Sequence, residues 1–265
     1  MRVLAVVAAS TLAIAFLWVP AGAAFEVRPT NARAAALCAE ALGMLQDLAL
    51  PDRPDSVTWT VAGSSGGLYG LPGASTQVAS LARSGRRKAA RLLIGRLGSP
   101  PYEERTLAAG VSWSPAAGTW ILCDLRALNL RAAPETDTWA GAVDVAVCRV
   151  VFGRLVAGAS IENVGRSRVL SSDVPVVHTL GFLMRLDGVS LVAGSEIEAG
   201  FEPASTLGCE MTPASSLALR FGLGFDPGRV GAGLGTEVAG VEIDVAWQWH
   251  PLLGASTRVS VTRVF

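Results

Sequence analysis

Hydrophobic and polar residues alternate along most of the chain after residue 57. In 241–250, VEIDVAWQWH, every second residue is valine, isoleucine or tryptophan, and the residues between them are mostly polar. The segments 106–113, 216–225 and 229–238 alternate in the same way. Successive side chains point to opposite faces of a strand, whereas a helix would scatter them around its axis. The pattern therefore predicts strands with one apolar face and one polar or small-residue face.

About fourteen such segments can be counted between residue 57 and the C-terminus. Their approximate limits are 57–63, 76–84, 88–97, 104–114, 119–131, 138–150, 154–163, 176–187, 189–200, 204–212, 216–225, 229–239, 241–250 and 254–265. Each segment and its connection take about 15 residues, which fits membrane strands of ~9–11 residues joined by short connections.

The connections between these segments alternate in length. Counted back from the C-terminus, the short ones are 239–240, 212–215, 187–188, 151–153, 115–118 and 85–87. The others include 64–75, 98–103, 132–137 and 164–175, which are longer on average. Outer-membrane barrels have short periplasmic turns and longer outer loops. The sequence thus predicts an all-β fold, an antiparallel transmembrane β-barrel of about 14 strands over 57–265.

Residues 1–24 have the features of an export signal. Arg2 precedes the apolar run Val3–Val19, and Ala21-Gly22-Ala23 forms a small-residue cleavage site. A cut one residue later, before Phe25, and retention of the run as an anchor are the alternatives. A cleaved signal implies a bacterial outer-membrane location for the barrel that follows.

Residues 25–56 separate this signal from the barrel. An alanine-rich stretch predicts a helix over 32–49, which Asn31 could cap and Pro51 ends. A linker, PDRPDS, occupies 51–56. The predicted organisation is a signal at 1–24, a helical segment with its linker at 25–56, and the barrel at 57–265.

The composition agrees with a membrane barrel and excludes several other classes. Hydrophobic residues make up 51% and charged residues only 17%, with a formal net charge of zero and a mean hydropathy of +0.43. Such a chain is not disordered, and it lacks the basic excess of a nucleic-acid-binding protein. A soluble secreted β-sandwich is the alternative fold, but its outer faces must meet water and are usually less apolar.

Aromatic residues stand near the predicted strand ends. Tryptophans there are typical of the girdles at the two membrane interfaces. The predicted girdle consists of Trp113, Trp120, Trp139, Trp247 and Trp249. The chain ends in RVSVTRVF, and its terminal Phe265 resembles the assembly signal of bacterial outer-membrane barrels. That resemblance implies the barrel assembly machinery as a partner, and outer-membrane lipids as the surroundings of a monomer.

Several stretches resemble the PorV/PorQ-like outer-membrane proteins, which are relatives of the FadL-type channels for hydrophobic compounds. They are NARAAALCAEAL after the signal, GLYGLP at 67–72, GASIENVG at 158–165 and WHPLLGASTRVSV at 249–261. The chain departs from the family where WTVAGSSGG lacks the family's Asn-Pro and where Leu37-Cys38 replaces a Gly-Gly. The resemblance implies passage of small hydrophobic molecules or, alternatively, an adaptor or shuttle role in protein secretion.

The sequence offers little chemistry for catalysis. Only His178 and His250 could serve as bases, and no GxSxG nucleophile motif is present. A lipid hydrolase on the barrel is therefore the least supported function, and we expect a non-enzymatic protein. The four cysteines, Cys38, Cys123, Cys148 and Cys209, have no metal-binding spacing and are expected to be small apolar residues within strands; disulfides in an exported chain are the alternative, and the sequence indicates no pair. We expect no metal and no cofactor.

In each predicted strand, alternate residues form a polar face that should point into the lumen. This predicts which charged residues face the lumen. They are Asp124, Arg126, Asp144, Glu162, Glu196, Glu198, Glu210, Arg220, Glu237, Glu242 and Asp244. This set could line a polar conduit or hold a ligand with a positive or polar head. Alternatively the acids pair with Arg126 and Arg220, and the 32–49 helix fills a narrow lumen. Inward glycines such as Gly231, Gly233 and Gly235 would let that helix lie close to the wall.

Overall fold

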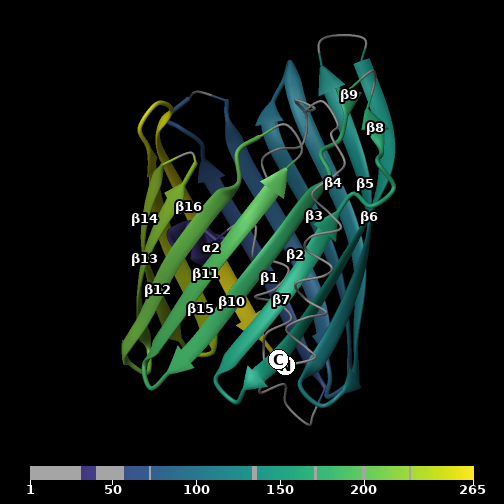
Figure 1. The fold of residues 1–265 in the computed structure, drawn as a ribbon. Coiled ribbons are helices and arrows are strands. Elements are labelled where there is room, and N and C mark those ends of the chain that lie inside the picture. Colours follow the sequence, from purple (N-terminus) through teal and green to yellow (C-terminus); the bar gives the residue numbers. More distant parts are fainter. Residues whose placement is uncertain are drawn as a thin grey trace.

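The structure, a computed structural model, describes residues 31–39, 57–71, 73–132, 136–169, 172–198, 201–226 and 228–265. Fourteen antiparallel strands close into one barrel, in the order β1-β16-β15-β14-β13-β12-β11-β10-β7-β6-β5-β4-β3-β2 (Figure 1). This confirms the predicted all-β fold. The strands are β1 Thr58–Gly67, β2 Ser75–Ser84, β3 Lys88–Ser99, β4 Tyr102–Ala116, β5 Thr119–Ala132, β6 Thr136–Phe152, β7 Leu155–Glu162, β10 Val177–Leu186, β11 Val189–Glu198, β12 Ala204–Ala214, β13 Leu217–Phe225, β14 Arg229–Val238, β15 Val241–His250 and β16 Gly254–Val264.

The barrel closes where its first and last strands pair. The register between β1 and β16 runs from Thr60↔Val264 to Gly67↔Thr257. The backbones of Trp59 and Phe265 exchange two hydrogen bonds, of 3.1 and 2.8 Å. The closed sheet leaves no strand edge, which is what a sheet needs if its backbone is to be satisfied inside a bilayer. None of the helices among the described residues is long and apolar enough to cross a membrane.

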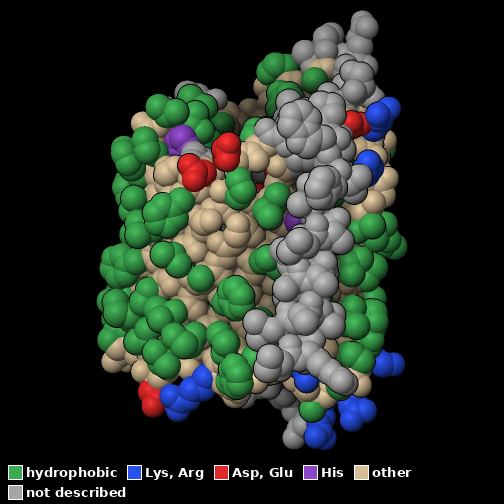
Figure 2. Space-filling view, viewed as in Figure 1, with side chains coloured by type: hydrophobic (Ala, Val, Ile, Leu, Met, Phe, Trp, Pro, Cys, Tyr) green, Lys and Arg blue, Asp and Glu red, His purple; other side chains and the backbone are tan. Residues whose placement is uncertain are grey.

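The outer face of the barrel is apolar, and many of its buried side chains are polar. Leu125, Ile94 and Phe221 expose more than half of their surface, whereas Asp124, Asp144 and Arg220 are each 2% exposed. Hydrophobic side chains cover the outer surface of the strands (Figure 2). A soluble sandwich would show the opposite distribution, so the predicted alternation sorts these residues as a lipid-facing barrel requires.

The two ends of the barrel differ. The connections at one end are short turns such as Asp187-Gly188 and Ala239-Gly240, and the C-terminus lies there too (Figure 1). We call this the turn end. The other end, the loop end, includes the connection between β7 and β10. A small hairpin of β8, Arg168–Val169, and β9, Ser172–Asp173, forms in this connection, although its residues show no alternating strand pattern.

The helix predicted over 32–49 is much shorter in the described residues. Helix α2 covers only Ala32–Ala36, and Asn31 caps it by accepting a hydrogen bond from the Ala34 N–H at 2.8 Å. The chain turns at Leu37 and Cys38, where Cys38 has a positive φ of 50° that ends the helix. Residues 40–49, the export signal at 1–24 and the linker at 51–56 lie outside the described residues.

Four of the five predicted girdle tryptophans lie on the outer face. Trp113, Trp139, Trp247 and Trp249 are each more than 40% exposed. The prediction that Trp120 belongs to the girdle is wrong, because this side chain is 8% exposed and packs among buried side chains of the interior. It pairs with Cys148, whereas Trp113 pairs with Ile121, so the two tryptophans point to opposite faces. The face of the sheet on which a tryptophan lies follows from its position in the alternation of the strand, and not from its distance to a turn.

A polar group lies on the outer face beyond the apolar band, at the loop end. The Glu103 carboxylate contacts Arg105 and lies 2.9 Å from Arg96 Nη2. Arg96 follows the apolar outer residues of β3, and Glu103 and Arg105 precede those of β4. Burial by itself raises the pKa of Glu103. The hydrogen bond from Arg105 and the charges of Arg105, Arg96 and Arg131 outweigh it and hold this pKa below its ordinary value.

This pKa predicts a pH-dependent contribution of Glu103 to stability. Because the folded-state pKa is lowered, the stabilisation is present above the unfolded pKa and is lost as the pH falls through the folded one. At pH 7 the Glu103→Gln variant should lose about 1 kcal/mol or less, and the loss should shrink as the pH falls below the ordinary glutamate pKa of about 4.3 and vanish below the lowered pKa of Glu103. Urea unfolding of both proteins across this range measures it. A difference that stays constant with pH would contradict the assignment.

Candidate functional site

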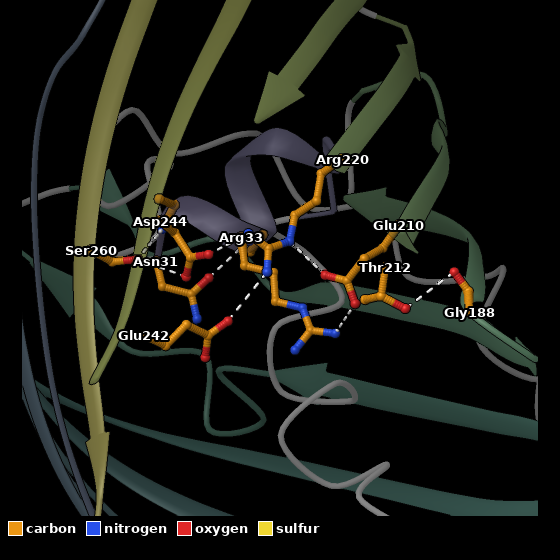
Figure 3. A network of polar contacts seen from close by, with 11 residues as sticks. Asn31, Arg33, Gly188, Glu210, Thr212, Arg220, Glu242, Asp244 and Ser260 are labelled. Carbon is orange, nitrogen blue, oxygen red and sulfur yellow. Dashed lines mark hydrogen bonds and ion pairs between the residues drawn. The ribbon is translucent and has the colours of Figure 1, made fainter. Parts of the chain in front are cut away.

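Arg220 is the centre of an ion-pair cluster inside the barrel. It lies on β13, and its side chain is almost completely buried. The side chain contacts residues of β12 on one side and, across β14, of β15 on the other. Its Nε donates to Glu210 Oε2 at 2.5 Å, one Nη contacts Asp244, and the other lies 3.3 Å from Glu242 Oε1 (Figure 3). Three carboxylates therefore surround one guanidinium, and they leave negative charge for a second cation.

The second cation comes from the N-terminal segment. Arg33 Nη2 donates to Glu210 Oε1 at 2.6 Å, so Glu210 bridges Arg33 and Arg220 (Figure 3). The Ala32 N–H donates to Ser260 Oγ at 3.3 Å, and Ser260 Oγ in turn lies 3.4 Å from Asp244 Oδ2. Polar contacts of α2 to β12 and β16, the second supported by Asp244 of β15, thus fix the helix inside the barrel.

Glycines form the wall against which α2 and its C-terminal turn lie. A Cβ added at Gly222 would stand 2.7 Å from Cys38 N, and one at Gly231 would stand 2.5 Å from the Ala36 carbonyl oxygen. A Cβ at Gly233 would be 2.5 Å from Ala36 Cβ. Side chains at these positions would overlap the segment 35–38, so the close approach expected from Gly231 and Gly233 is confirmed. Gly235 differs, because it makes room for the Arg220 guanidinium rather than for the helix.

Two further arginines form ion pairs on the opposite wall. Arg126 Nη2 donates to Asp144 Oδ1 at 2.7 Å and lies 3.8 Å from Glu162 Oε2. Arg91 donates to Asp124 from both Nε, at 3.2 Å, and Nη2. Each of these carboxylates is buried beside an arginine, which is the pairing that a charge needs away from bulk water.

Apolar side chains fill the interior on either side of these charges. Toward the turn end, Trp120, Leu122, Cys148 and others form one buried cluster that includes Leu37. Toward the loop end, Leu128, Leu130 and Ala142 form a second cluster with Val169 and Val174. The interior therefore has ion-paired clusters on both walls. On β5, β6, β7 and β11, apolar clusters lie toward either end of the Arg126 ion pairs.

The β8–β9 connection covers the loop-end cluster. The pairing of β6 with β7 stops at Val145↔Ile161, and the connection folds over the part of β6 beyond it. Asn163 is fully buried there and makes four hydrogen bonds, one of them from the Arg166 N–H to its backbone carbonyl. Its N–H donates to Asp144 Oδ1, its Nδ2 donates to the Val174 carbonyl, and its Oδ1 accepts from the Ser167 N–H. The ion pair of Arg126 thereby supports the connection that carries Val169 and Val174.

The structure separates the remaining predicted residues from these clusters. Glu196 and Glu198 lie on β11 and are half-buried, and Glu237 is exposed near the turn-end mouth. His178 lies between Ile161 and Ile197 on the outer face, and His250 Nδ1 accepts hydrogen bonds from the Leu252 and Leu253 amides. Among the described residues, no group of three or more His, Cys, Asp or Glu side chains could hold a metal ion.

Sequence reasoning missed three of the residues that organise the interior. Arg33 was treated as part of an alanine-rich helix, although the excess of luminal acids called for another cation. Arg91 lies on the inward parity of β3 and could have been found by the same alternation that identified Asp124. Asn163 ends the predicted strand 154–163 and lies in the stretch GASIENVG, but alternation alone does not show that it ties the following connection to Asp144.

Comparison with known proteins shows the fold. No family model matches the chain, and no curated protein matches its sequence. Among solved structures, it is similar to the toluene transporter TbuX of Ralstonia pickettii, with 11% identity and a TM-score of 0.59 over 91% of this chain and 98% of that one. A FadL homologue of Pseudomonas aeruginosa has 11% identity and a TM-score of 0.61 over 92% and 99%. The CymD monoaromatic hydrocarbon channel has 10% identity and a TM-score of 0.60 over 91% and 98%.

The first of these structures is described as a transporter and the third as a channel, and at these identities the similarity shows that the chain shares their fold. A fourth, the outer membrane protein Omp33 of Acinetobacter baumannii, matches over a smaller part, with 8% identity and a TM-score of 0.52 over 78% and 98%. No similarity specific to PorV or PorQ is found among these structures.

Proposed function

We propose that this chain is a bacterial outer-membrane β-barrel that binds small hydrophobic molecules and lets them pass. The observation that carries the proposal is the buried apolar cluster on β5 and β6 toward the loop end of its interior. Leu128, Leu130 and Ala142 are buried on the inward face of the wall, where a water-filled pore would have polar side chains. Ligand sites are mostly apolar with a few placed polar groups, which matches this cluster beside the Arg126 ion pair.

The neighbouring charges do not contradict this function. Arg126 and Arg91 are each paired with a buried carboxylate, so the charged layer next to the apolar cluster is internally compensated. The similar solved structures are described as a toluene transporter and a monoaromatic hydrocarbon channel. These descriptions support small, uncharged hydrophobic molecules as the class of substrate, and we extend that class to this chain.

A polar substitution in the apolar cluster should lower passage. We expect the Leu130→Asn variant to lose about tenfold of the protein-dependent uptake of labelled toluene, because an apolar contact is replaced by a group that toluene cannot hydrogen-bond. The measurement is the initial rate of uptake in cells that produce the chain, minus the rate in cells with an empty vector.

Leu252→Asn is the matched control, since the same change is made at a loop residue that is 90% exposed. It should leave toluene uptake unchanged. Two results would contradict the function: toluene uptake equal to that of the empty vector, or an equal increase in the entry of a hydrophilic solute such as maltotriose. The adaptor role in secretion gains no support from the similar structures, and we do not propose it.

A further inference from the structure

Basic side chains gather around the outside of the turn end. Arg83, Lys88, Arg149 and Arg263 lie on the outer face near this end, and all four are exposed. The turns themselves carry Arg86, Arg87 and Arg154. Among the described turn residues at this end, the one carboxylate is that of Asp187, 3.3 Å from Arg154. Lys and Arg side chains accordingly predominate along the lower rim in Figure 2.

Two of these arginines stack on aromatic rings where the barrel closes. The Arg83 guanidinium carbon lies 5.9 Å from the centroid of the Trp59 ring, and that of Arg263 lies 4.7 Å from the Phe265 ring. Arg83 is the register partner of Trp59, and Arg263 that of Val61, so the two stacks occupy the neighbouring strands β16, β1 and β2. Within the described part of the chain, no carboxylate pairs with either guanidinium.

The stacks hold two cations at the border of the apolar band. Val61, Leu81 and Val261 continue the outer face of the same three strands and are 39–48% exposed. Arginine over an aromatic ring keeps its charge while its carbon stem lies on apolar surface. We call the outer face of β16, β1 and β2 the seam. It presents guanidinium groups at the turn end and, next to them, apolar side chains that acyl chains can contact.

We propose that this turn-end rim, centred on Arg83 and Arg263, binds the headgroups of anionic phospholipids in the leaflet that faces the periplasm. The proposal rests on the proposed outer-membrane placement, with the short turns on the periplasmic side. Guanidinium groups match phosphate geometry, and a net negative headgroup such as phosphatidylglycerol carries no ammonium that would compete with them. Basic residues at a membrane surface attract anionic lipid by about 1 kcal/mol each, which is about fivefold.

The outer face of the loop end is a poorer match for an anion. There Arg96 and Arg105 share the Glu103 carboxylate, and Arg131 lies 3.9 Å from Asp137. Carboxylates between the arginines compensate their charge and repel a phosphate. Charge complementarity therefore favours the leaflet at the turn end over the leaflet at the loop end.

The test uses the full chain inserted into phosphatidylcholine vesicles that contain a minor fraction of brominated phosphatidylglycerol or brominated phosphatidylcholine. Bromine quenches nearby tryptophan, and Trp59 lies at the centre of the seam. The wild type should associate preferentially with phosphatidylglycerol, and the double variant Arg83→Gln/Arg263→Gln should lose about 25-fold of that preference, about fivefold for each arginine. High salt should weaken the preference of the wild type, because the seam is exposed.

The matched control is Arg131→Gln/Arg166→Gln, which removes two positive charges from the loop end and should keep the preference. Equal association of both lipids with the wild type, or an unchanged preference in the Arg83→Gln/Arg263→Gln variant, would overturn the proposal. Stronger competition by lipopolysaccharide than by phosphatidylglycerol at the same seam would overturn the assignment to the periplasmic leaflet. Failure to insert into any vesicle overturns the membrane placement as well, whereas insertion without preference overturns only the lipid site.

Discussion

Replacement of Arg220 by methionine is expected to destabilise the barrel by about 3–5 kcal/mol. Methionine keeps much of the side-chain volume but removes the guanidinium that contacts Glu210, Asp244 and Glu242. Two of these carboxylates, Glu210 and Asp244, are more than 90% buried, so water cannot replace the lost donors. Arg33 would remain as the one cation that the structure places on this cluster, and it reaches only Glu210.

Urea unfolding of the protein inserted in vesicles measures this loss. The Arg149→Met variant is the control, because it makes the same change at an exposed outer position and should alter stability by less than about 1 kcal/mol. A triple variant that combines Arg220→Met with Glu210→Gln and Asp244→Asn should recover part of the loss, since it removes the unpaired charges. An Arg220→Met variant as stable as the wild type would contradict a central role for this cluster.

The Gly222→Leu variant is expected to displace the N-terminal segment from the wall. A side chain at this position meets the backbone of Leu37 and Cys38, and neither strand β13 nor the segment has a flexible group that could give way. If the segment stays in place, such overpacking costs about 1–3 kcal/mol. Displacement avoids that cost and leaves the inward face of β13–β16 uncovered.

Entry of the chromogenic substrate nitrocefin into intact cells reports on the opening. It should rise in the Gly222→Leu variant relative to the wild type. Gly63→Leu is the control, because the nearest atom to its added Cβ is 3.8 Å away and the glycine belongs to the outer-face parity of β1. Unchanged nitrocefin entry together with unchanged stability in Gly222→Leu would show that the turn at Leu37 and Cys38 does not lie against β13.

The alternation of apolar and polar residues was sufficient to predict the barrel. In a strand such as VEIDVAWQWH, only one assignment of residues to the two faces keeps the apolar side chains outward. A shift by one residue would turn Asp244 to the lipid and Ile243 to the interior. The same parity placed Arg220 beside luminal acids, and it would have placed Trp120 inside the barrel had it been applied there instead of the nearness of a turn. Local pattern therefore decides the face of a residue, but not its partner.

The interior arrangement depended on contacts between distant parts of the chain. Arg33 and Glu210 are 177 positions apart, and no local pattern indicates that the Arg33 side chain of α2 reaches β12 rather than another strand. The glycines on β13 and β14 showed that something lies close to the wall, without showing which residues. The break of the helix at Leu37–Cys38 was hidden because alanine-rich sequence favours a longer helix. Asn163 and the hairpin over the loop-end cluster are fixed by side-chain hydrogen bonds within an irregular connection.

The central claim is that the chain folds as a closed barrel in the outer membrane. Gel mobility of unboiled and boiled samples from the outer-membrane fraction tests it most directly, because a folded barrel keeps its compact shape in detergent until it is heated. We predict that the protein sediments with the outer membrane and that its mobility shifts on boiling. A protein found in the soluble periplasmic fraction, with the same mobility before and after boiling, would contradict the barrel, its proposed passage of hydrophobic molecules and its lipid-binding rim.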